Sequence, residues 1–240
     1  MSPFNSPLSN NKADYLIECL KVDNGNVVLD IGCGDGEFLI RLLEASDVRG
    51  IGVDINQACI ATASTRATER LRNGAVEFRH GDFLEQTFES NSFDVVICIG
   101  ASHVFDSGEM AYPACIDAVT QLLKPGGRAL IGESYWKRPP ESEYVEFIGE
   151  PVGIYQDHQG NVSVAESLGL DAVCAVVSSD EEWDAFEWSH YRQAHRYAAE
   201  NPNTPAATQR LERSRMWRDG YLRWGRTTMG FGFYLLINGT

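Results

Sequence analysis

The stretch that decides the fold is Val27-Val28-Leu29-Asp30-Ile31-Gly32-Cys33-Gly34-Asp35-Gly36-Glu37. Its first five residues are mostly apolar and predict a buried strand, and the alternating glycines predict a tight turn into a helix. Glycines at the carboxyl end of such a strand let the backbone approach a ligand closely. The spacing is GxGxG, whereas a dinucleotide-binding loop reads GxGxxG, and Glu37 stands at the position of that third glycine. Because a carboxylate at a helix start repels a pyrophosphate, the loop favours a nucleoside ligand without phosphates.

Acidic residues follow the next two predicted strands. Asp54 lies 18 positions after Gly36 and can accept hydrogen bonds from both hydroxyls of a ribose. Asp82, or the backbone beside it, can meet an adenine amino group, and the neighbouring Phe83 can cover the ring. The carboxyl ends of adjacent parallel strands meet at one edge of a sheet, so these signals together predict one nucleoside site.

Short apolar runs alternate with helical patterns through the first half, which predicts βαβ units and a parallel sheet buried on both faces. The predicted strands are Asn26–Ile31, Val48–Val53, Val76–Arg79, Phe93–Ile99, Arg128–Gly132 and Ala172–Val177. The predicted crossover helices are Glu37–Ala45, Gln57–Leu71 and Met110–Leu123, and Lys124-Pro125-Gly126-Gly127 stops the third of them. The terminal run Phe231–Ile237 predicts a last strand inserted antiparallel.

With these signals the chain resembles the class I S-adenosylmethionine-dependent methyltransferases over nearly its whole length. The matching motifs are LDIGCGDG (Leu29–Gly36), GVDIN (Gly52–Asn56), GDF (Gly81–Phe83), FDVVICIG (Phe93–Gly100) and LKPGGRALIGE (Leu123–Glu133). The IGESYW and DEEWDAFEW segments also resemble a bacterial branch of small-molecule methyltransferases. The resemblance implies a Rossmann-like α/β fold with a seven-stranded, mostly parallel sheet in the order 3-2-1-4-5-7-6, whose last strand is antiparallel.

The same resemblance implies S-adenosylmethionine as the cofactor. It places the methionine part against Asp30, Gly32 and Gly34, the ribose on Asp54, and the adenine near Ile55, Asp82 and Phe83. The full set of predicted cofactor-binding residues is Asp30, Gly32, Cys33, Gly34, Gly36, Asp54, Ile55, Asn56, Gly81, Asp82, Phe83, Ile99 and Gly100. Cys33 is expected to fit this loop as a small side chain, without a chemical role.

We expect one methyltransferase domain over residues 1–240. It divides into an N-terminal helical segment (1–24), a cofactor-binding core (25–136), an irregular insertion (137–160), a short helix (Val162–Leu168) and a helical hairpin (180–226) between the sixth and seventh strands. The hairpin helices are predicted at Trp183–Ala199 and Thr208–Arg223. Their aromatic residues at helical spacing favour packing on the sheet edge over a substrate lid.

Candidates for activating the methyl acceptor follow the fourth and fifth strands. Methyl transfer from a sulfonium needs alignment of the reacting atoms, and a base when the acceptor is a hydroxyl, thiol or protonated amine. His103 and Glu133 are the predicted catalytic residues, and for each the alternative is an ordinary loop hydrogen bond. Tyr135, Trp136 and Trp183 are the predicted substrate-binding residues, and their alternative is core packing.

Composition restricts the partners. With 34 acidic against 20 basic residues the net charge is −14, which opposes nucleic acid and anionic lipid and favours a small-molecule acceptor. We recognise neither a secretory signal nor a membrane span, so we expect a cytoplasmic protein, as a monomer or a homodimer. The six cysteines form no CxxC pair and indicate reduced, mostly buried thiols. His190 and His195 lie five apart, a poor spacing for chelation, so no metal is predicted.

Two other functions stay open at this level. A nicotinamide-dependent oxidoreductase would require the GxGxxG spacing. A regulatory protein that binds the cofactor without catalysis would have the same motifs if residues 137–160 plugged the acceptor site. No NPPY-type motif of DNA amino-methylation follows the fourth strand, and no cysteine pair suits a metalloid. We therefore predict methyl transfer to O, N or S of a small organic acceptor.

Overall fold

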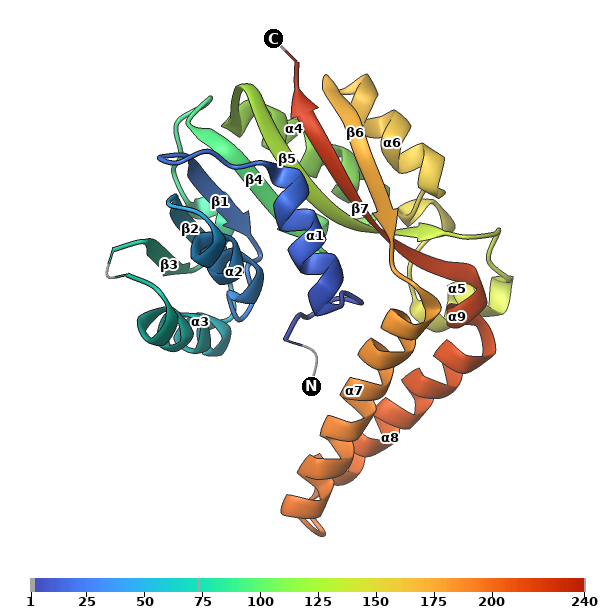
Figure 1. Cartoon of the computed structure of the whole chain (residues 1–240). Coiled ribbons are helices and arrows are strands. Elements are labelled where there is room, and N and C mark those ends of the chain that lie inside the picture. The colour runs from blue at the N-terminus through green and yellow to red at the C-terminus, as the bar shows by residue number, and fades with distance from the viewer. Residues whose placement is uncertain (1–2, 73, 240) are drawn as a thin grey trace.

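Seven strands form one sheet in the computed structural model, which describes residues 3–72 and 74–239 (Figure 1). They are β1 (Val27–Ile31), β2 (Arg49–Asp54), β3 (Val76–His80), β4 (Phe93–Ile99), β5 (Leu123–Trp136), β6 (Leu170–Val177) and β7 (Met229–Asn238). Their order across the sheet is β3-β2-β1-β4-β5-β7-β6, and β7 runs antiparallel to both of its neighbours. The predicted fold class, sheet order and antiparallel last strand are confirmed.

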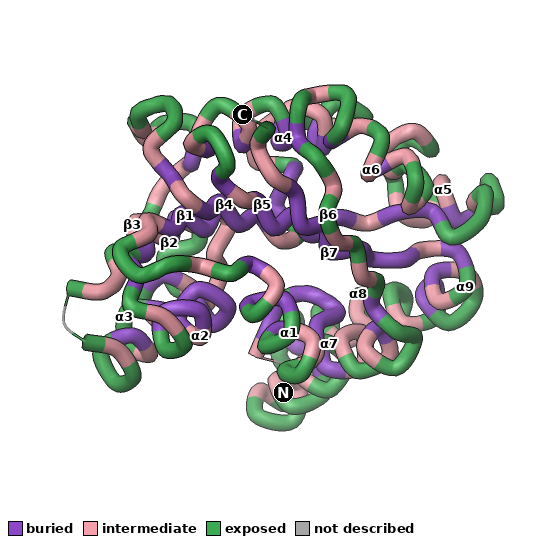
Figure 2. The backbone as a smooth tube through the Cα atoms, turned by 45° about the horizontal axis from the view of Figure 1, so that its top comes forward, coloured by how far each residue is buried: buried purple, intermediate pink, exposed green. Residues whose placement is uncertain are grey.

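Helices cover both faces of this sheet (Figure 2). One face carries α1 (Asn10–Leu20), α2 (Glu37–Ala45), α3 (Gln57–Arg70) and the start of α7 (Asp180–Glu200), and the other carries α4 (Ala111–Leu122) and α6 (His158–Ser167). α7 and α8 (Pro205–Gly220) form a hairpin that projects away from the sheet, with α5 (Ser142–Ile148) and α9 (Arg226–Thr228) near its base (Figure 1). Single turns of 3₁₀ helix lie at Phe83–Glu85, Ser102–Val104, Gly108–Met110 and Val152–Ile154, and a π-helical turn at Tyr221–Gly225.

The core consists of two apolar clusters, one on each face of the sheet. Successive residues of a strand point to opposite faces, so Val28 packs with Leu16 and Leu39, whereas Leu29 packs with Ile116. Both strand residues are fully buried. β1 is therefore apolar at every position except Asp30, which ends up near the carboxyl edge of the sheet.

β5 is longer than the predicted strand Arg128–Gly132. β7 pairs with it continuously from Arg128 opposite Ile237 to Trp136 opposite Met229, which extends the strand at its carboxyl end. α4 ends at Leu122, just before the Lys124-Pro125-Gly126-Gly127 run that is predicted to stop it. That run does not form a separate turn, because it belongs to the start of β5. The other predicted strands and crossover helices are present with small shifts of their ends.

The prediction of an irregular insertion over residues 137–160 was wrong, because these residues contain α5 and the start of α6. α5 is only seven residues long, and tertiary contacts hold it. The Tyr144 ring packs 6.1 Å from Trp136 and 6.0 Å from Trp224, and the Phe147 ring lies 5.4 Å from Trp217. Long-range aromatic packing of this kind leaves no periodic signal in the local sequence.

The helical hairpin lies between β6 and β7, as predicted, with both helices starting earlier. Ser179 accepts a hydrogen bond from the Glu182 N–H while the Glu182 carboxylate accepts one from the Ser179 N–H, so a capping box starts α7 at Asp180. Thr204 caps α8, which begins at Pro205.

Cysteines and helix lengths give two further results. All six cysteines are free, but only Cys98 and Cys115 are fully buried, so the expectation of mostly buried thiols was wrong for the other four. Over the described ranges, no helix combines the length and the apolar character that crossing a membrane requires.

Candidate active site

The glycine loop after β1 turns tightly against the end of β4. Gly32 has a φ of 67°, and a Cβ there would lie 2.4 Å from the Cβ of Ala101. The Gly32 N–H donates to the carbonyl of Val53 at 2.9 Å. A Cβ on Gly34, by contrast, would meet nothing within 4 Å. The loop is therefore packed on one side and open on the other, where a ligand can approach the backbone.

Asp54 holds this loop from the end of β2. Its Oδ2 accepts a hydrogen bond from the Gly34 N–H at 2.8 Å, and its Oδ1 accepts one from the Asn56 N–H at 2.7 Å. Asn56 in turn caps α3 by accepting from the Ala58 N–H at 3.0 Å. Each carboxylate oxygen can accept more than one hydrogen bond, so Asp54 positions the loop and keeps acceptor capacity for ribose hydroxyls.

Asp30 brings a buried carboxyl group to the same place. It is 4% exposed, and burial together with the charge of Asp54 raises the pKa of Asp30 to about 8. Burial, with the charges of both aspartates, also raises the pKa of the Cys33 thiol. A cationic group of a ligand beside Asp30 would favour its ionised form. The loop thus suits the positively charged methionine part of the predicted cofactor, with Cys33 as a neutral side chain.

The part of the site that follows β2 and β3 carries two apolar side chains and a carboxylate that caps a 3₁₀ turn. Ile55 is 72% exposed, which is unusual for its type and leaves its side chain free to cover a flat ring. Phe83 is buried and packs edge-on against Phe105 at 5.4 Å. Asp82 accepts a hydrogen bond from the Leu84 N–H at 2.9 Å. These side chains follow β2 and β3, as the sequence predicts.

These residues line one cavity of about 690 Å³, which we call the cofactor cavity. Its volume falls within the range of roughly 300–1,000 Å³ that is usual for cofactor sites, so the residues present fit S-adenosylmethionine. Twelve of the thirteen predicted cofactor-binding residues line it: Asp30, Gly32, Cys33, Gly34, Asp54, Ile55, Asn56, Gly81, Asp82, Phe83, Ile99 and Gly100. Gly36 does not line the cavity, because it packs inward, where a Cβ would lie 2.7 Å from the ring of Phe78.

The sequence did not predict the part of the wall formed by the N-terminal segment and α7. Pro3, Phe4, Asn5, Ser6 and Leu8 line the cofactor cavity, as do Ser189, His190 and Gln193. The only available signal was the pair of apolar residues, Phe4 and Leu8, within an otherwise polar start. Nothing in their spacing indicates which part of the fold they cover.

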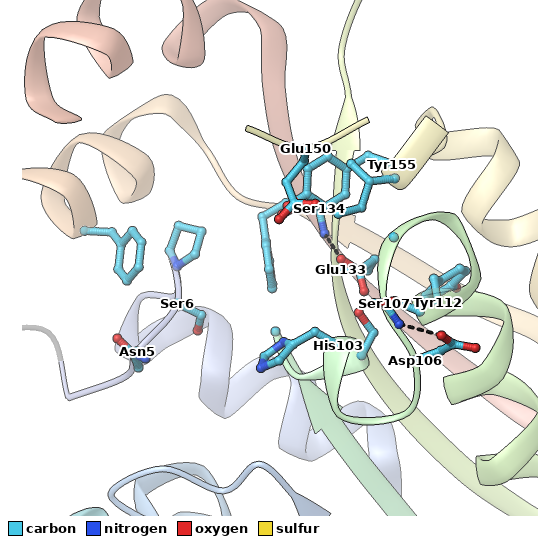
Figure 3. A pocket seen from close by; sticks show the side chains of 18 of the residues that line it. Asn5, Ser6, His103, Asp106, Ser107, Tyr112, Glu133, Ser134, Glu150 and Tyr155 are labelled. Carbon is cyan, nitrogen blue, oxygen red and sulfur yellow. Dashed lines mark hydrogen bonds between the residues drawn. The ribbon is translucent and has the colours of Figure 1, made fainter. Parts of the chain in front are cut away.

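A second cavity of about 380 Å³, the acceptor cavity, adjoins the first (Figure 3). Both predicted catalytic residues line it, and four residues line both cavities: Asn5, Ser6, Gly100 and His103. Figure 3 shows Asn5 and Ser6 across the cavity from Glu133. The two spaces therefore meet beyond the end of β4, where the sequence places the methyl-transfer step.

Glu133 lines this cavity and carries an unpaired oxygen. It is 7% exposed, and its Oε1 accepts a hydrogen bond from the Ser134 N–H at 2.8 Å. Its Oε2 is buried and has no hydrogen-bond partner among the described residues. Burial raises the pKa of Glu133, and the Ser102 hydroxyl and the Ser134 N–H partly offset the rise. Buried oxygens of this kind are normally paired, so a ligand group is the natural partner.

Of the three predicted substrate-binding residues, one lines the described cavities and two do not. Trp183 lines the acceptor cavity, and its buried Nε1 has no partner among the described residues. Tyr135 and Trp136 are absent from the walls of the described cavities. Tyr135 packs on His158 at 5.2 Å, and the Trp136 Nε1 donates to the Val152 carbonyl at 2.9 Å. Tyr155, which packs edge-on against Trp136 with ring centroids 5.2 Å apart, does line the acceptor cavity.

The described residues contain no group of three or more histidine, cysteine, aspartate or glutamate side chains placed to hold a metal ion.

Glu37, the carboxylate that the sequence predicts to repel a pyrophosphate, forms ion pairs with arginines. Its carboxylate lies 2.7 Å from both Arg41 and Arg70. Although burial opposes it, these hydrogen bonds lower the pKa of Glu37.

Comparison with known proteins agrees with this site. The family described as methyltransferase domain matches residues 28–127. YjhP of Escherichia coli K12 is 28% identical over 97% of this chain and 92% of its own, and its crystal structure superposes with a TM-score of 0.89. A S-adenosylmethionine-dependent methyltransferase from Geobacter sulfurreducens, crystallised with S-adenosylhomocysteine, is 25% identical with a TM-score of 0.89 over 98% of this chain and 94% of that one.

A more distant relative is the 27-O-demethylrifamycin SV methyltransferase of Amycolatopsis mediterranei, which is 30% identical over 70% of this chain. The match spans about half of that enzyme, 54% of its length. The motifs, the sheet order and the cofactor cavity agree with these matches, and the chain belongs to the class I S-adenosylmethionine-dependent methyltransferases, with S-adenosylmethionine as its cofactor.

Proposed function

We propose that the chain is an enzyme that transfers a methyl group to the O, N or S atom of a small organic acceptor seated in the acceptor cavity. The observation that carries this proposal is the buried, unpaired Oε2 of Glu133 in a cavity that adjoins the cofactor cavity. A protein that only binds the cofactor has no need for such a costly group beside the cofactor site.

S-adenosylmethionine supplies an electrophilic methyl group when bound. The shared wall at Gly100 and His103 brings an acceptor within reach of that group, and alignment at about 3–3.5 Å accounts for much of the rate gain. Glu133 holds Oε1 on the Ser134 N–H and leaves Oε2 to take a proton from the acceptor. The raised pKa of Glu133 makes it a stronger base than an exposed glutamate. His103 can orient the acceptor or take the proton.

Residues 137–160 support an open site. Three of their side chains, Glu150, Ile154 and Tyr155, line the acceptor cavity, and a volume of about 380 Å³ remains. They form part of the wall and do not fill the cavity, which argues against a plugged, non-catalytic protein.

Titration calorimetry with S-adenosylmethionine, S-adenosylhomocysteine and NAD tests the proposal. We expect micromolar binding of the adenosyl ligands only, lost in Asp54→Ala and retained in Glu133→Gln. With a panel of small acceptors, formation of S-adenosylhomocysteine should fall about 10²–10⁴-fold in Glu133→Gln, the usual worth of a general base. Glu212→Gln, an exposed glutamate of α8, is the matched control and should retain full activity.

Because Asp54 also holds the loop, Asp54→Asn and a urea unfolding curve are needed to separate lost binding from lost folding. Binding of NAD in place of the adenosyl ligands would overturn the proposal. Unchanged turnover in Glu133→Gln would remove the role assigned to Glu133.

A further inference from the structure

A third cavity of about 390 Å³ lies at the base of the hairpin, between α5, α7, α8 and the π-helical turn, and we call it the aromatic cavity. Its wall is built mainly of rings: Tyr144, Phe147, Tyr155, Trp183, Phe186, Trp217 and Tyr221. Several rings support one another, with Phe147 centred 6.4 Å from Tyr144 and 5.4 Å from Trp217. Such a slot accepts a flat or apolar group by contact with ring faces.

The aromatic cavity adjoins the acceptor cavity. Tyr155, Trp183 and Phe186 line both spaces, and Glu133 lies on the acceptor side of these rings. A single ligand that passes between these shared rings would extend from the methyl-transfer point to the base of the hairpin. Its reacting atom would lie near Glu133 and its body among the aromatic side chains.

The charges along this path are negative. Asp106, Glu133 and Glu150 line the acceptor cavity, and Glu187 lines the aromatic cavity. The described lining residues of these two cavities include neither lysine nor arginine. A phosphate or carboxylate on the acceptor would find no cationic partner there, whereas an ammonium group would find carboxylates and the negative faces of aromatic rings.

Of these carboxylates, Glu133 is the buried one with an unpaired oxygen, whereas Asp106 and Glu150 are exposed. Its Oε2 is unpaired, whereas the Trp217 side chain already donates to Glu187 and the Ser107 N–H donates to Asp106 at 2.6 Å. Burial raises the pKa of Glu187 to about 7, the Trp217 hydrogen bond opposing the rise, so this wall loses much of its charge near neutral pH. An apolar body can lie against it.

We propose that the methyl acceptor is an amine, protonated in solution, whose nitrogen lies at Glu133 Oε2 and whose apolar, flat body occupies the aromatic cavity. This inference rests on the proposed function. The ammonium gives one proton to Glu133 Oε2, which frees the nitrogen lone pair. That lone pair forms a bond to the methyl carbon as the carbon–sulfur bond breaks, and the electron pair of the broken bond stays on sulfur. The positive charge of the sulfonium thus passes to the methylated amine.

Three probes with the same body test the charge preference: phenethylamine, phenethyl alcohol and phenylacetate. Their binding to the protein saturated with S-adenosylhomocysteine is measured by titration calorimetry, and methyl transfer is followed with S-adenosylmethionine. We expect the amine to bind at least tenfold more tightly than the alcohol or the acid, and to be the probe that is methylated. Glu133→Gln should remove the preference for the amine, while Glu212→Gln should retain it.

The site of the body is tested separately. Trp217 is half exposed, so Trp217→Ala should leave folding intact while weakening the amine and the alcohol by a similar factor of at least five. Trp188→Ala is the matched control, because Trp188 lies on the same hairpin outside the walls of the described cavities.

Equal or tighter binding of the alcohol or the acid overturns the inference, and so does the absence of binding by all three probes to the S-adenosylhomocysteine complex. These comparisons use the wild-type chain, so a misfolded variant cannot obscure them. Either result leaves the proposed function in place. That function fails separately, if the wild-type chain does not bind S-adenosylhomocysteine at all.

Discussion

Gly32→Ala tests whether the close approach of the glycine loop to β4 is as tight as the structure shows. Two costs add at this position. The left-handed backbone, with φ of 67°, costs an alanine about 1–2 kcal/mol. The new Cβ would lie 2.4 Å from the Ala101 Cβ, far inside the usual carbon–carbon contact of about 3.5–4.0 Å. Overpacking of this kind costs about 1–3 kcal/mol, so we expect a total loss of about 2–5 kcal/mol.

Gly34→Ala is the control that isolates the backbone cost. Gly34 also has a left-handed backbone, with φ of 53°, but an added Cβ meets nothing within 4 Å. Its loss should therefore be about 1–2 kcal/mol. Ala101→Gly removes the other side of the contact. Combined with Gly32→Ala it should recover about 1–3 kcal/mol, the overpacking part alone, as the coupling energy of a double-mutant cycle.

Urea unfolding of the four proteins and the wild type measures these free energies, provided that the slope of each transition is unchanged. Equal losses in Gly32→Ala and Gly34→Ala would show that the loop does not press on Ala101. A cycle with no coupling would show the same. Either result would refute the packed side of the cofactor loop as described.

Four further predictions follow from the ionisable and capping groups. Binding of S-adenosylmethionine near pH 7 should release up to one proton, because burial raises the pKa of Asp30 to about 8 and a cationic ligand lowers it again. Calorimetry in buffers of different ionisation enthalpy should show the release, and Asp30→Asn should abolish it. In the free protein the native state holds that proton between about pH 4 and 8 while the unfolded chain loses it, so the unfolding free energy should fall as pH rises through this window, less steeply in Asp30→Asn. The pH dependence of Glu37 has the opposite sign. Its pKa is lowered, so its contribution to the unfolding free energy is present above about pH 4.5 and is lost as pH falls. Glu37→Gln should therefore lower the unfolding free energy by about 1–3 kcal/mol at pH 7 and by less in acid, as urea curves at the two pH values would show. Ser179→Ala removes one half of the capping box and should cost about 1 kcal/mol in thermal or urea unfolding, whereas Ser142→Ala, at the first residue of α5 and not at its N-cap, should cost less.

The cofactor side could be predicted because each of its signals is local. Gly32 and Gly34 adopt backbone angles that few other residues tolerate, so the sequence around them is constrained within a few positions. Asp54 ends a strand and reaches back to the Gly34 N–H, and Asp82 caps the turn after β3. A residue type fixed by its own backbone geometry can be recognised without knowing the rest of the fold.

The acceptor side could not be predicted in the same way, because contacts between distant segments build it. The Ser178 hydroxyl donates to the Pro7 carbonyl at 2.5 Å, and Lys12 pairs with Glu182, so the N-terminal segment is tied to the start of the hairpin. The two residues of each pair lie far apart in the sequence, by 171 and 170 positions respectively. Tyr135 and Trp136 are absent from the walls of the described cavities for the same reason, since the packing of residues 137–160 brings Tyr155 to the acceptor cavity instead.

The two cavities therefore differ in how they are built, and that difference bears on specificity. Strand ends and the loops that follow them form most of the cofactor cavity, so they cannot change without disturbing the fold. In the acceptor cavity, Glu133 and Ser134 belong to the sheet, whereas Tyr155, Trp183 and Phe186 come from segments added to it. Substitutions in these added segments can reshape the space for the acceptor while Asp54 and the glycine loop keep their geometry. Under the proposed function, the sheet thus fixes where a proton is taken, at Glu133, and the added segments decide which molecule is held there.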